Sequence, residues 1–362
     1  MTEITNRVCD STKNDIDDIM SQNNFIYDTK DFEDRFKRFT GTSYCVGVSS
    51  GTAALHLALD AIGIKKRDQV ATVSHTFRAT VAAIKYVGAE PVYVDIEPHS
   101  FCMDPLLLKK TLDDNPNIKA VIAVHLYGNS ADIEKIADLC KSRKVKLIED
   151  CSQAHGTFKQ GKHVGTFGDI GTFSFFPGKG IGAFGDAGAC ITNNIEYSNY
   201  ITEARSWKED EIGYNYRMST INARFLCHKI DHYKKVLHEK REIAKKYDEH
   251  FRNTLVNLDV EHSYHIYSIL HPHRDKFEGI QDDFIQPKNT HRIEYSIESR
   301  VYKWYLDENG DVIDYEEGMD GMGNAITDDY SLIKRLWDEI YCNLSGQSVL
   351  QNLYEKVIRN KK

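Results

Sequence analysis

Short apolar runs alternate with helix-like patterns between about residues 40 and 195. Runs typical of buried strands occur at residues 69–75, 90–96, 120–128, 144–150, 171–177 and 187–193. Apolar residues take the spacing of a helix over residues 52–64, 78–88 and 130–143. Because strands alternate with helices, we predict an α/β fold with a mostly parallel sheet covered on both faces.

The pattern changes after Lys146, where strand-like runs follow one another with little helix between them. Part of the sheet is therefore expected to be joined by hairpins or short crossovers. A long charged helical pattern from about Thr220 to Leu255 indicates a connector into a smaller C-terminal region. A chain of 362 residues fits two domains. We predict a large domain of residues 1–240 and a small domain of residues 241–362.

Composition excludes several classes of protein. Apolar residues make up 41% and charged residues 28%, as in a soluble globular protein, and the net charge of −8 argues against a nucleic-acid partner. The polar start of the chain has no apolar segment of the secretory kind, and no membrane span is expected. Eight scattered cysteines form no CxxC pair, which favours reduced thiols in a cytoplasmic protein without zinc.

The stretch "VGVSSGTAALHLAL" runs from a strand directly into an apolar-periodic helix. Its small and hydroxyl-bearing residues, from Ser49 to Thr52, stand at the helix N-terminus. Free backbone N–H groups and the helix dipole favour an anion such as phosphate there. An ordinary helix capped by Ser or Thr would have the same sequence, so both interpretations stay open.

Two other phosphate motifs are not met. A P-loop requires glycine at position 173 and Ser or Thr at position 180, where this chain has Phe173 and Gly180. Gly180, Gly182 and Gly185 match the G-x-G-x-x-G spacing, but the residues after them are typical of a turn and a strand rather than a helix. A dinucleotide site is therefore a weak alternative.

The string "KLIEDCSQAHGTF" ends a buried strand in two acids. Alternation predicts Ile148 and Asp150 on one face of the sheet and Glu149 on the other. Ligands of α/β proteins bind at the carboxyl edge of the sheet, so Asp150 could hold a cofactor's ring nitrogen protonated there. A solvent-exposed acid at a strand end is the alternative.

Lys179 lies alone among apolar residues and glycines in "FSFFPGKGIGAFG". Surface lysines usually have polar neighbours. A lysine that loses hydration has a lowered pKa and becomes a nucleophile that forms Schiff bases with carbonyls. The alternative is a lysine that extends from a glycine-rich loop into solvent.

Together these segments resemble the DegT/DnrJ/EryC1/StrS aminotransferases, pyridoxal-phosphate enzymes of fold type I that aminate keto-sugars attached to nucleotides. The segments that match in order are "GVSSGTAALHLAL", "HTFRATVAAIKYVGAEPVYVD", "LIEDCSQAHG", "SFFPGKGIGAFGDAGA" and "GYNYRMSTINA". The resemblance covers about residues 25 to 250. It implies a large cofactor-binding domain with a mixed, mostly parallel sheet and a smaller C-terminal α+β domain.

The resemblance also implies roles for residues around the cofactor ring. Lys179 would be the Schiff-base lysine, and Asp150 would pair with the pyridine nitrogen. Phe77 would stack on the ring, and Gln153 would face its hydroxyl group. With Asp150 holding the ring nitrogen positive, a freed Lys179 can move a proton as general base and acid.

For the cofactor phosphate, the resemblance implies two sets of contacts. Ser50, Gly51, Thr52 and Ser174 would bind it within one subunit. Asn215 would reach the phosphate of a neighbouring subunit's cofactor. The protein would therefore be a homodimer or larger, with shared active sites.

Some positions depart from the family pattern. Gly180 stands where Asn is usual, Ala187 where Gly is common, and Asn222 where Gln is common. The late "PLH" segment with nearby tyrosines is missing. We therefore predict that residues 262–324 select the acceptor, and the basic candidates are Arg274, Arg292, Arg300 and Lys303. The His pair in "HPHR" has no third ligand at a suitable spacing, so no metal site is expected.

The predicted function is amino transfer, with L-glutamate as donor, to a nucleotide-linked keto-sugar for surface glycan assembly. Alternatives are a small phosphorylated ketone or aldehyde as acceptor, and a pyridoxal-phosphate sugar dehydratase on the same fold. A dehydratase typically has His in place of the lysine, and Lys179 argues against it. A non-catalytic descendant would be expected to lose Lys179 or Asp150.

Overall fold

The computed structural model describes residues 28–207, 213–248 and 259–268, together with three strands between residues 291 and 315. These residues form two compact units. One unit comprises residues 28–207, 213–238 and 259–265. The other comprises residues 239–248, 266–268 and the three later strands. The division into domains at residues 240 and 241 stays a prediction.

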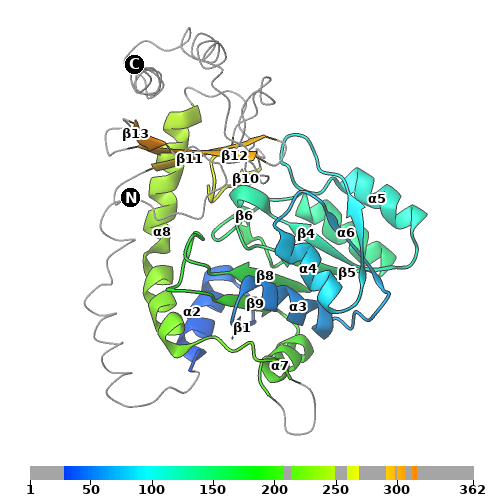
Figure 1. The fold of residues 1–362 in the computed structure, drawn as a ribbon. Coiled ribbons are helices and arrows are strands. Elements are labelled where there is room, and N and C mark those ends of the chain that lie inside the picture. Colours follow the sequence, from blue (N-terminus) through cyan, green and yellow to red (C-terminus); the bar gives the residue numbers. More distant parts are fainter. Residues whose placement is uncertain are drawn as a thin grey trace. The chain divides into compact units, whose positions relative to one another are not determined.

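A seven-stranded sheet forms the centre of the first unit (Figure 1). Its strand order is β1-β9-β8-β5-β4-β2-β3. All neighbouring pairs are parallel except those made by β9, which runs antiparallel to both β1 and β8. The strands are β1 Tyr44–Val48, β2 Gln69–Val73, β3 Glu90–Val94, β4 Ile118–Val124, β5 Lys146–Asp150, β8 Ile170–Ser174 and β9 Gly188–Thr192. The mostly parallel sheet is confirmed. After β5, which pairs with β8 in parallel, β8 and β9 form an antiparallel pair, in line with the expected change of connection.

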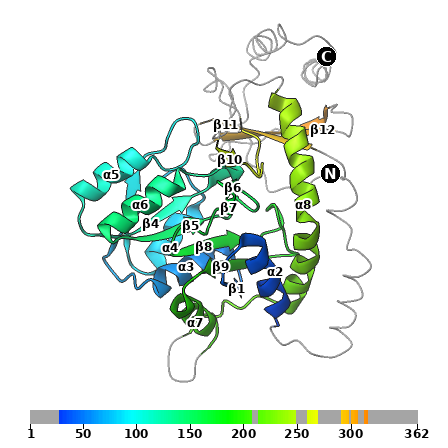
Figure 2. The same ribbon diagram turned by 180° about the vertical axis from the view of Figure 1, so that it is seen from behind.

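Helices cover both faces of this sheet (Figures 1 and 2). The helices α3 Gly51–Ala61, α4 Arg78–Tyr86 and α7 Ile195–Ala204 cover one face. The other face is covered by α2 Lys30–Thr40, α5 Pro105–Asp114, α6 Ile133–Arg143 and the first part of α8 Thr220–Asp248. The sequence predicted α3, α4, α6 and α8, whereas α2, α5 and α7 were missed.

Each face has its own apolar core. On one side the buried residues of α3 pack with Val46, Ile122 and Ile148 from the sheet. On the other side Phe32 and Phe36 of α2 meet Phe175 edge to face, with ring centroids 5.3 and 5.1 Å apart. Burial of such aromatic rings contributes about 2 kcal/mol each, so α2 is held by its phenylalanines although most of its surface is charged.

Smaller elements complete the description. A 3-10 turn, η1 Leu126–Gly128, follows β4, and the short strands β6 Phe158–Lys159, β7 Lys162–His163 and β10 Val260–Glu261 form a second sheet. In the second unit β11 His291–Ile297, β12 Arg300–Leu306 and β13 Val312–Tyr315 form an antiparallel sheet. None of the helices in the described part is long and apolar enough to cross a membrane.

The carboxyl ends of the parallel strands meet at one edge of the large sheet. Asp150 is the last residue of β5, and Ser174 is the last residue of β8. The strand β1 leads into Ser50, and β2 leads into Phe77. The topology therefore brings Ser50, Phe77, Asp150 and Ser174, which lie far apart in sequence, to the same edge of the sheet.

Candidate active site

Ser50, Gly51 and Ser174 form a close-packed cradle at the start of α3. Ser50 is the N-cap, and its side chain accepts a hydrogen bond of 3.1 Å from the backbone N–H of Ala53. A Cβ atom at Gly51 would lie 2.7 Å from Cβ of Ser174, and one at Gly188 would lie 2.3 Å from the carbonyl oxygen of Ser50. Contacts this short leave room for glycine only.

The cradle suits a phosphate group. The first-turn amides of α3 point out of the helix end, and that turn carries no acidic residue. Thr52 stands in the first turn of α3, and Ser174 at the end of β8 lies against Gly51. Both residues carry hydroxyls and are partly buried. Backbone amides and hydroxyls can therefore neutralise an anion here without a basic side chain.

Asp150 is a buried carboxylate, 5% exposed, at the carboxyl end of β5. Thr80 Oγ1 of α4 donates to its Oδ2 at 2.9 Å, and the backbone N–H of Ser152 donates to its Oδ1 at 3.1 Å. Its side chain thus lies on the α3–α4 face, where Ile148 also packs. The predicted alternation is confirmed, and a solvent-exposed strand-end acid is excluded.

The neighbouring Glu149 points to the opposite face and is fully buried. It accepts hydrogen bonds of 2.7 Å from the backbone N–H groups of Gly165, Phe167 and Gly168, and it pairs with His125 Nε2 at 3.0 Å. Glu149 therefore fixes the loop before β8. This role was not predicted, because its donors come from a loop sixteen or more residues later in the chain.

His125, Glu149 and Cys151 lie close enough together to resemble a metal site. The N–H of Ala131 donates to His125 Nδ1 at 3.2 Å, so Nε2 carries the proton that bonds Glu149. Burial holds the pKa of the Cys151 thiol well above its usual value, which keeps it protonated. The hydrogen bonds thus explain this group as a structural network.

Lys179 lies at the tip of a tight turn that follows β8. Its N–H donates to the carbonyl of Phe176 at 2.8 Å, and the N–H of Ala183 donates to the carbonyl of Phe175 at 2.8 Å. Burial lowers the pKa of the Lys179 amine, while the negative charge of Asp150 acts in the opposite direction. An amine that is easily deprotonated is the form that attacks a carbonyl.

Phe77 and Gln153 lie at the same edge of the sheet. Phe77 is the N-cap residue of α4, and its ring is 61% exposed. An apolar ring so exposed at this edge can cover the face of a planar ligand. Gln153 Oε1 accepts a 2.7 Å hydrogen bond from the N–H of Tyr127, which leaves its amide hydrogens to act as donors elsewhere.

Asn215 is an exposed residue in the segment that precedes α8. The segment lies beside the end of β1, because the N–H of Ser49 donates to the carbonyl of Tyr216 at 2.8 Å. The rings of Tyr214 and Tyr216 stack at 5.1 Å, and Arg217 donates to Asn215 Oδ1 at 2.6 Å. The contact of Asn215 with a neighbouring subunit stays a prediction.

This set of groups fits pyridoxal phosphate. The glycine cradle suits the phosphate, the exposed phenyl ring suits the pyridine face, and the buried carboxylate suits a protonated ring nitrogen. The lysine, whose pKa burial lowers, suits the aldehyde. The other matches rest on the contacts and exposures described above.

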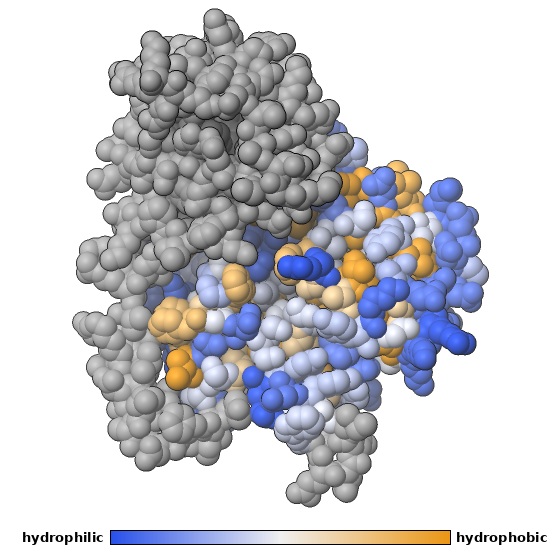
Figure 3. Space-filling model, viewed as in Figure 1, coloured by the Kyte–Doolittle hydropathy of each residue, from blue (hydrophilic) through white to orange (hydrophobic). Residues whose placement is uncertain are grey.

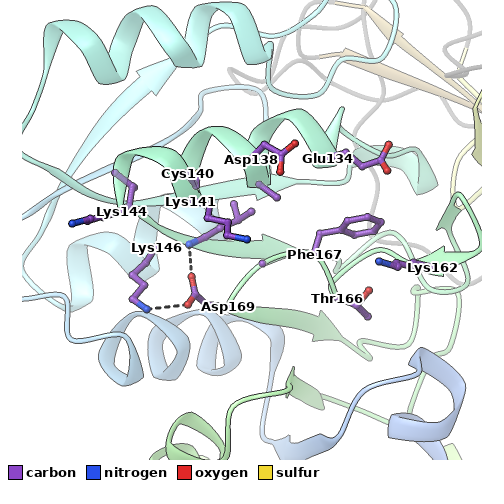
Figure 4. Close-up of a pocket in the computed structure, with 14 residues that line it drawn as sticks. Glu134, Asp138, Cys140, Lys141, Lys144, Lys146, Lys162, Thr166, Phe167 and Asp169 are labelled. Atoms are coloured by element: carbon purple, nitrogen blue, oxygen red, sulfur yellow. Dashed lines mark hydrogen bonds and ion pairs between the residues drawn. The ribbon is translucent and has the colours of Figure 1, made fainter.

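A cavity of about 750 Å³ lies elsewhere, between α6 and the amino end of β5 (Figure 4). Its lining includes Lys141, Lys144, Lys146 and Asp169. The carboxylate of Asp169 is bonded to Lys146 Nζ at 3.0 Å and to the N–H of Leu147 at 2.9 Å. None of the predicted site residues lines this cavity, which lies at the opposite end of β5 from Asp150.

Comparisons with known proteins identify relatives of the chain. The model of the DegT/DnrJ/EryC1/StrS aminotransferase family matches residues 10–311. The chain is 36% identical over 263 residues to a dTDP-3-amino-3,4,6-trideoxy-alpha-D-glucose transaminase of Micromonospora megalomicea subsp. nigra, covering 68% of this chain and 70% of the relative. It is 38% identical over 281 residues to GDP-perosamine synthase of Escherichia coli O157:H7, covering 74% of each.

A solved structure gives the same result. The described fold is similar to that of S. venezuelae DesV in complex with a ketimine intermediate, with a TM-score of 0.70 and 29% sequence identity. The match covers 74% of this chain and 75% of that chain. The similarity therefore extends over most of both chains.

Proposed function

Because this chain belongs to the DegT/DnrJ/EryC1/StrS aminotransferase family, we propose that it transfers an amino group from L-glutamate to a keto-sugar linked to a nucleotide. Its class is that of the pyridoxal-phosphate-dependent aminotransferases. The observation that carries the proposal is the position of Lys179, in a hydrogen-bonded turn after β8, at the same edge of the sheet as the buried Asp150 at the end of β5. We assign the product to surface glycan assembly in the cytoplasm.

The residues of this chain have distinct tasks in the proposed reaction. The bound cofactor supplies a ring that accepts electrons from the carbon that loses a proton. Lys179 would bond the cofactor aldehyde and, when it is not bonded, could carry the proton to and from the reacting carbon. Asp150 would keep the ring nitrogen protonated, and Phe77 would cover one face of the ring.

Four more residues hold the cofactor phosphate in the proposed arrangement. Ser50, Gly51 and Thr52 at the start of α3, and Ser174 at the end of β8, would bind it through amides and hydroxyls. Gln153 would donate a hydrogen bond from its amide to the ring hydroxyl. Removal of water by Phe77 and the acceptor strengthens each of these polar contacts.

The nucleotide-sugar acceptor is supported by the names of the relatives, which act on dTDP-linked and GDP-linked sugars. We propose that residues 262–324 choose the acceptor. Arg274 lies outside the described residues, and the side chains of Arg292, Arg300 and Lys303 do too. A small phosphorylated ketone or aldehyde is the second candidate acceptor.

We also propose a homodimer or larger assembly with shared active sites. Several large apolar side chains of the first unit are exposed, and the most exposed of the aromatic ones are Trp207, Phe77, Tyr86, Tyr93 and Phe176. Figure 3 shows apolar residues in separate groups among hydrophilic ones on the face seen in Figure 1. A partner subunit would remove such rings from water, at about 25 cal/mol per Å² buried.

One experiment tests the assignment directly. The purified protein, loaded with pyridoxal phosphate, should absorb visible light, and borohydride should fix the cofactor on Lys179, as read by peptide mass spectrometry. An adduct on another lysine would overturn the role of Lys179. Lys179→Ala is the matched control, because it should bind the cofactor without forming the adduct.

A second experiment tests the acceptor. The enzyme is given L-glutamate with a panel of nucleotide-linked keto-sugars and small phosphorylated ketones, and kcat/KM is measured for each. The panel is repeated with Arg292→Ala and Arg300→Ala and with the whole segment 262–324 exchanged. If acceptor preference stays unchanged in every variant, specificity lies in the large domain.

A further inference from the structure

Position 180, directly after Lys179, is glycine. The structure gives a physical reason for a glycine here. A Cβ atom at Gly180 would lie 2.3 Å from the hydroxyl oxygen of Tyr233 and 3.2 Å from its Cζ. No side chain fits at position 180 unless Tyr233 or the lysine turn moves.

Tyr233 is held firmly in place on α8. It is 3% exposed, and its hydroxyl donates a 3.1 Å hydrogen bond to the carbonyl of His155. Its ring meets Phe39 edge to face, with centroids 6.0 Å apart. Rotation of the ring away from Gly180 would break this buried hydrogen bond and leave its polar groups without a partner.

The other residues of the turn are also fixed. Hydrogen bonds close it at Phe176 and at Ala183, and Ile181 is fully buried in the same core as Tyr233. A Cβ atom at Gly182 would lie 2.4 Å from the carbonyl oxygen of Pro177. Between these anchors, the backbone at Gly180 sets the direction in which Lys179 leaves the turn.

We propose that Tyr233 is a positioning residue for Lys179. Its hydroxyl fills the space that a side chain at position 180 would need, and so it fixes the backbone that presents the lysine amine. The proposal rests on the proposed function of Lys179. The two residues share one space: the hydroxyl of Tyr233 fits there because residue 180, next to Lys179, has no side chain.

The pair can be tested by exchanging the two groups. Tyr233→Phe removes the hydroxyl group. Gly180→Ala adds a methyl group where that hydroxyl lies. The double variant has the methyl group of residue 180 in the space that the hydroxyl of residue 233 has left. Gly178→Ala is the control in the same turn, because its Cβ would meet nothing nearer than 3.8 Å. Four quantities are measured for each protein: kcat, KM for the acceptor, affinity for pyridoxal phosphate, and the melting temperature of the cofactor-free form.

We expect Gly180→Ala to lower kcat about 100-fold, the scale of a misplacement of about 1 Å, and to weaken cofactor binding. Tyr233→Phe should lower kcat about tenfold with little change in KM. The double variant should recover to within about tenfold of Tyr233→Phe, since neighbouring substitutions that share one space are not additive. Gly178→Ala should keep kcat and cofactor affinity within about twofold, as expected away from a steric clash.

Three results would overturn the proposal. One is a Gly180→Ala variant that behaves like Gly178→Ala. Another is a double variant whose loss is the product of the two single losses. The third is a Tyr233→Phe variant that changes the melting temperature alone. Failure of the proposed function is separate, because it would appear in the unmodified protein as the absence of a borohydride adduct on Lys179.

Discussion

Two adjacent carboxylates illustrate how strand alternation assigns different tasks to chemically similar residues. Asp150 faces α4 and the edge where the cofactor groups meet, with two hydrogen-bond donors. Glu149 lies on the opposite face of the sheet, where it accepts hydrogen bonds from four donors. The two residues cannot exchange positions, because side chains alternate along a strand. A one-residue shift would turn every side chain of β5 to the other face of the sheet.

We predict that Asp150→Asn keeps bound cofactor but lowers kcat about 100-fold or more, the scale for losing a preorganised electrostatic partner. An amide cannot keep the ring nitrogen positive. The measurement is the rate of amino transfer from glutamate together with the absorption of the bound cofactor. Near-normal turnover in this variant would make Asp150 a structural residue.

Glu149→Gln is the contrasting variant at the next position. Its amide group would face backbone N–H donors in place of a carboxylate oxygen, and a buried donor without an acceptor costs about 1–3 kcal/mol. We expect a lower melting temperature with kcat per folded protein nearly unchanged. A catalytic loss equal to that of Asp150→Asn would contradict the separation of roles.

A buried histidine gives the protein a pH dependence of stability. Burial lowers the pKa of His163 to about 4, and its Nε2 accepts a 2.9 Å hydrogen bond from the N–H of Gly156. The unfolded chain, with an ordinary histidine pKa of about 6.5, binds a proton first. Stability from this group is therefore complete above about pH 6.5 and is lost as the pH falls toward 4.

The predicted loss is on the order of 2 kcal/mol between pH 7.5 and pH 5, since one pKa unit corresponds to about 1.4 kcal/mol. It is measured as the change in urea midpoint of the unmodified protein compared with His163→Gln. The variant starts from lower stability but should lose less on acidification. Equal losses in both proteins would show that other groups determine the acid sensitivity.

At the scale of elements, the helix α3 and its cap were predictable because the signal is local. Small residues, a Ser N-cap and a run of apolar positions all stand within "SSGTAALHLAL". The helix α2 was missed although Phe32, Phe36 and Phe39 have the spacing of one helix face. What the sequence could not show is the surface that this face contacts, since Phe173 and Phe175 lie about 140 residues later.

The predicted residues of the site have local sequence signals, whereas the missed ones are defined by contacts with distant parts of the chain. Lys179, Asp150 and Gly51 stand in motifs that can be recognised in one stretch of chain. The partners of these motifs, Thr80 and Tyr233, come from other elements, and no spacing in the sequence connects them. Contacts between elements therefore determine how the recognisable residues are held.

The contact between α3 and β8 leads to a prediction at this scale. Gly51→Ala would place a methyl group 2.7 Å from Ser174 Cβ, so α3 or the end of β8 must shift. We expect cofactor affinity to fall about 100-fold, because a displaced helix end no longer presents its amides to the phosphate. Affinity is measured by titrating the cofactor-free protein with pyridoxal phosphate.

Gly185→Ala is the control, since a Cβ there would meet nothing within 4 Å. It adds the same methyl group to the same unit and should leave the affinity unchanged. Inorganic phosphate provides a second measurement. It should raise the melting temperature of the unmodified protein more than it raises that of the Gly51→Ala variant. If both glycine variants bind the cofactor equally well, the cradle is not the phosphate site.

At the scale of the whole molecule, the position of Asn215 makes the proposed sharing of active sites testable. The rings of Tyr214 and Tyr216 pack beside His56 of α3, with centroids 4.8 and 5.8 Å from its ring, while Asn215 between them is exposed. Asn215 bonds Arg217 of its own segment and is exposed to solvent, so a neighbouring subunit could reach it. The pairing within a symmetric dimer would be reciprocal.

We therefore predict that two inactive variants restore each other. Lys179→Ala lacks the lysine in its own site, and Asn215→Ala weakens the site of its partner. A hybrid dimer then has one site with both defects and one with neither, so equal mixing under subunit exchange should give about a quarter of the normal activity for random pairing in a two-fold dimer. Activity is measured before and after exchange, with mass spectrometry of the intact complex to count hybrids. Hybrids without recovered activity would show that each subunit completes its own site, and so would full activity in a monomer.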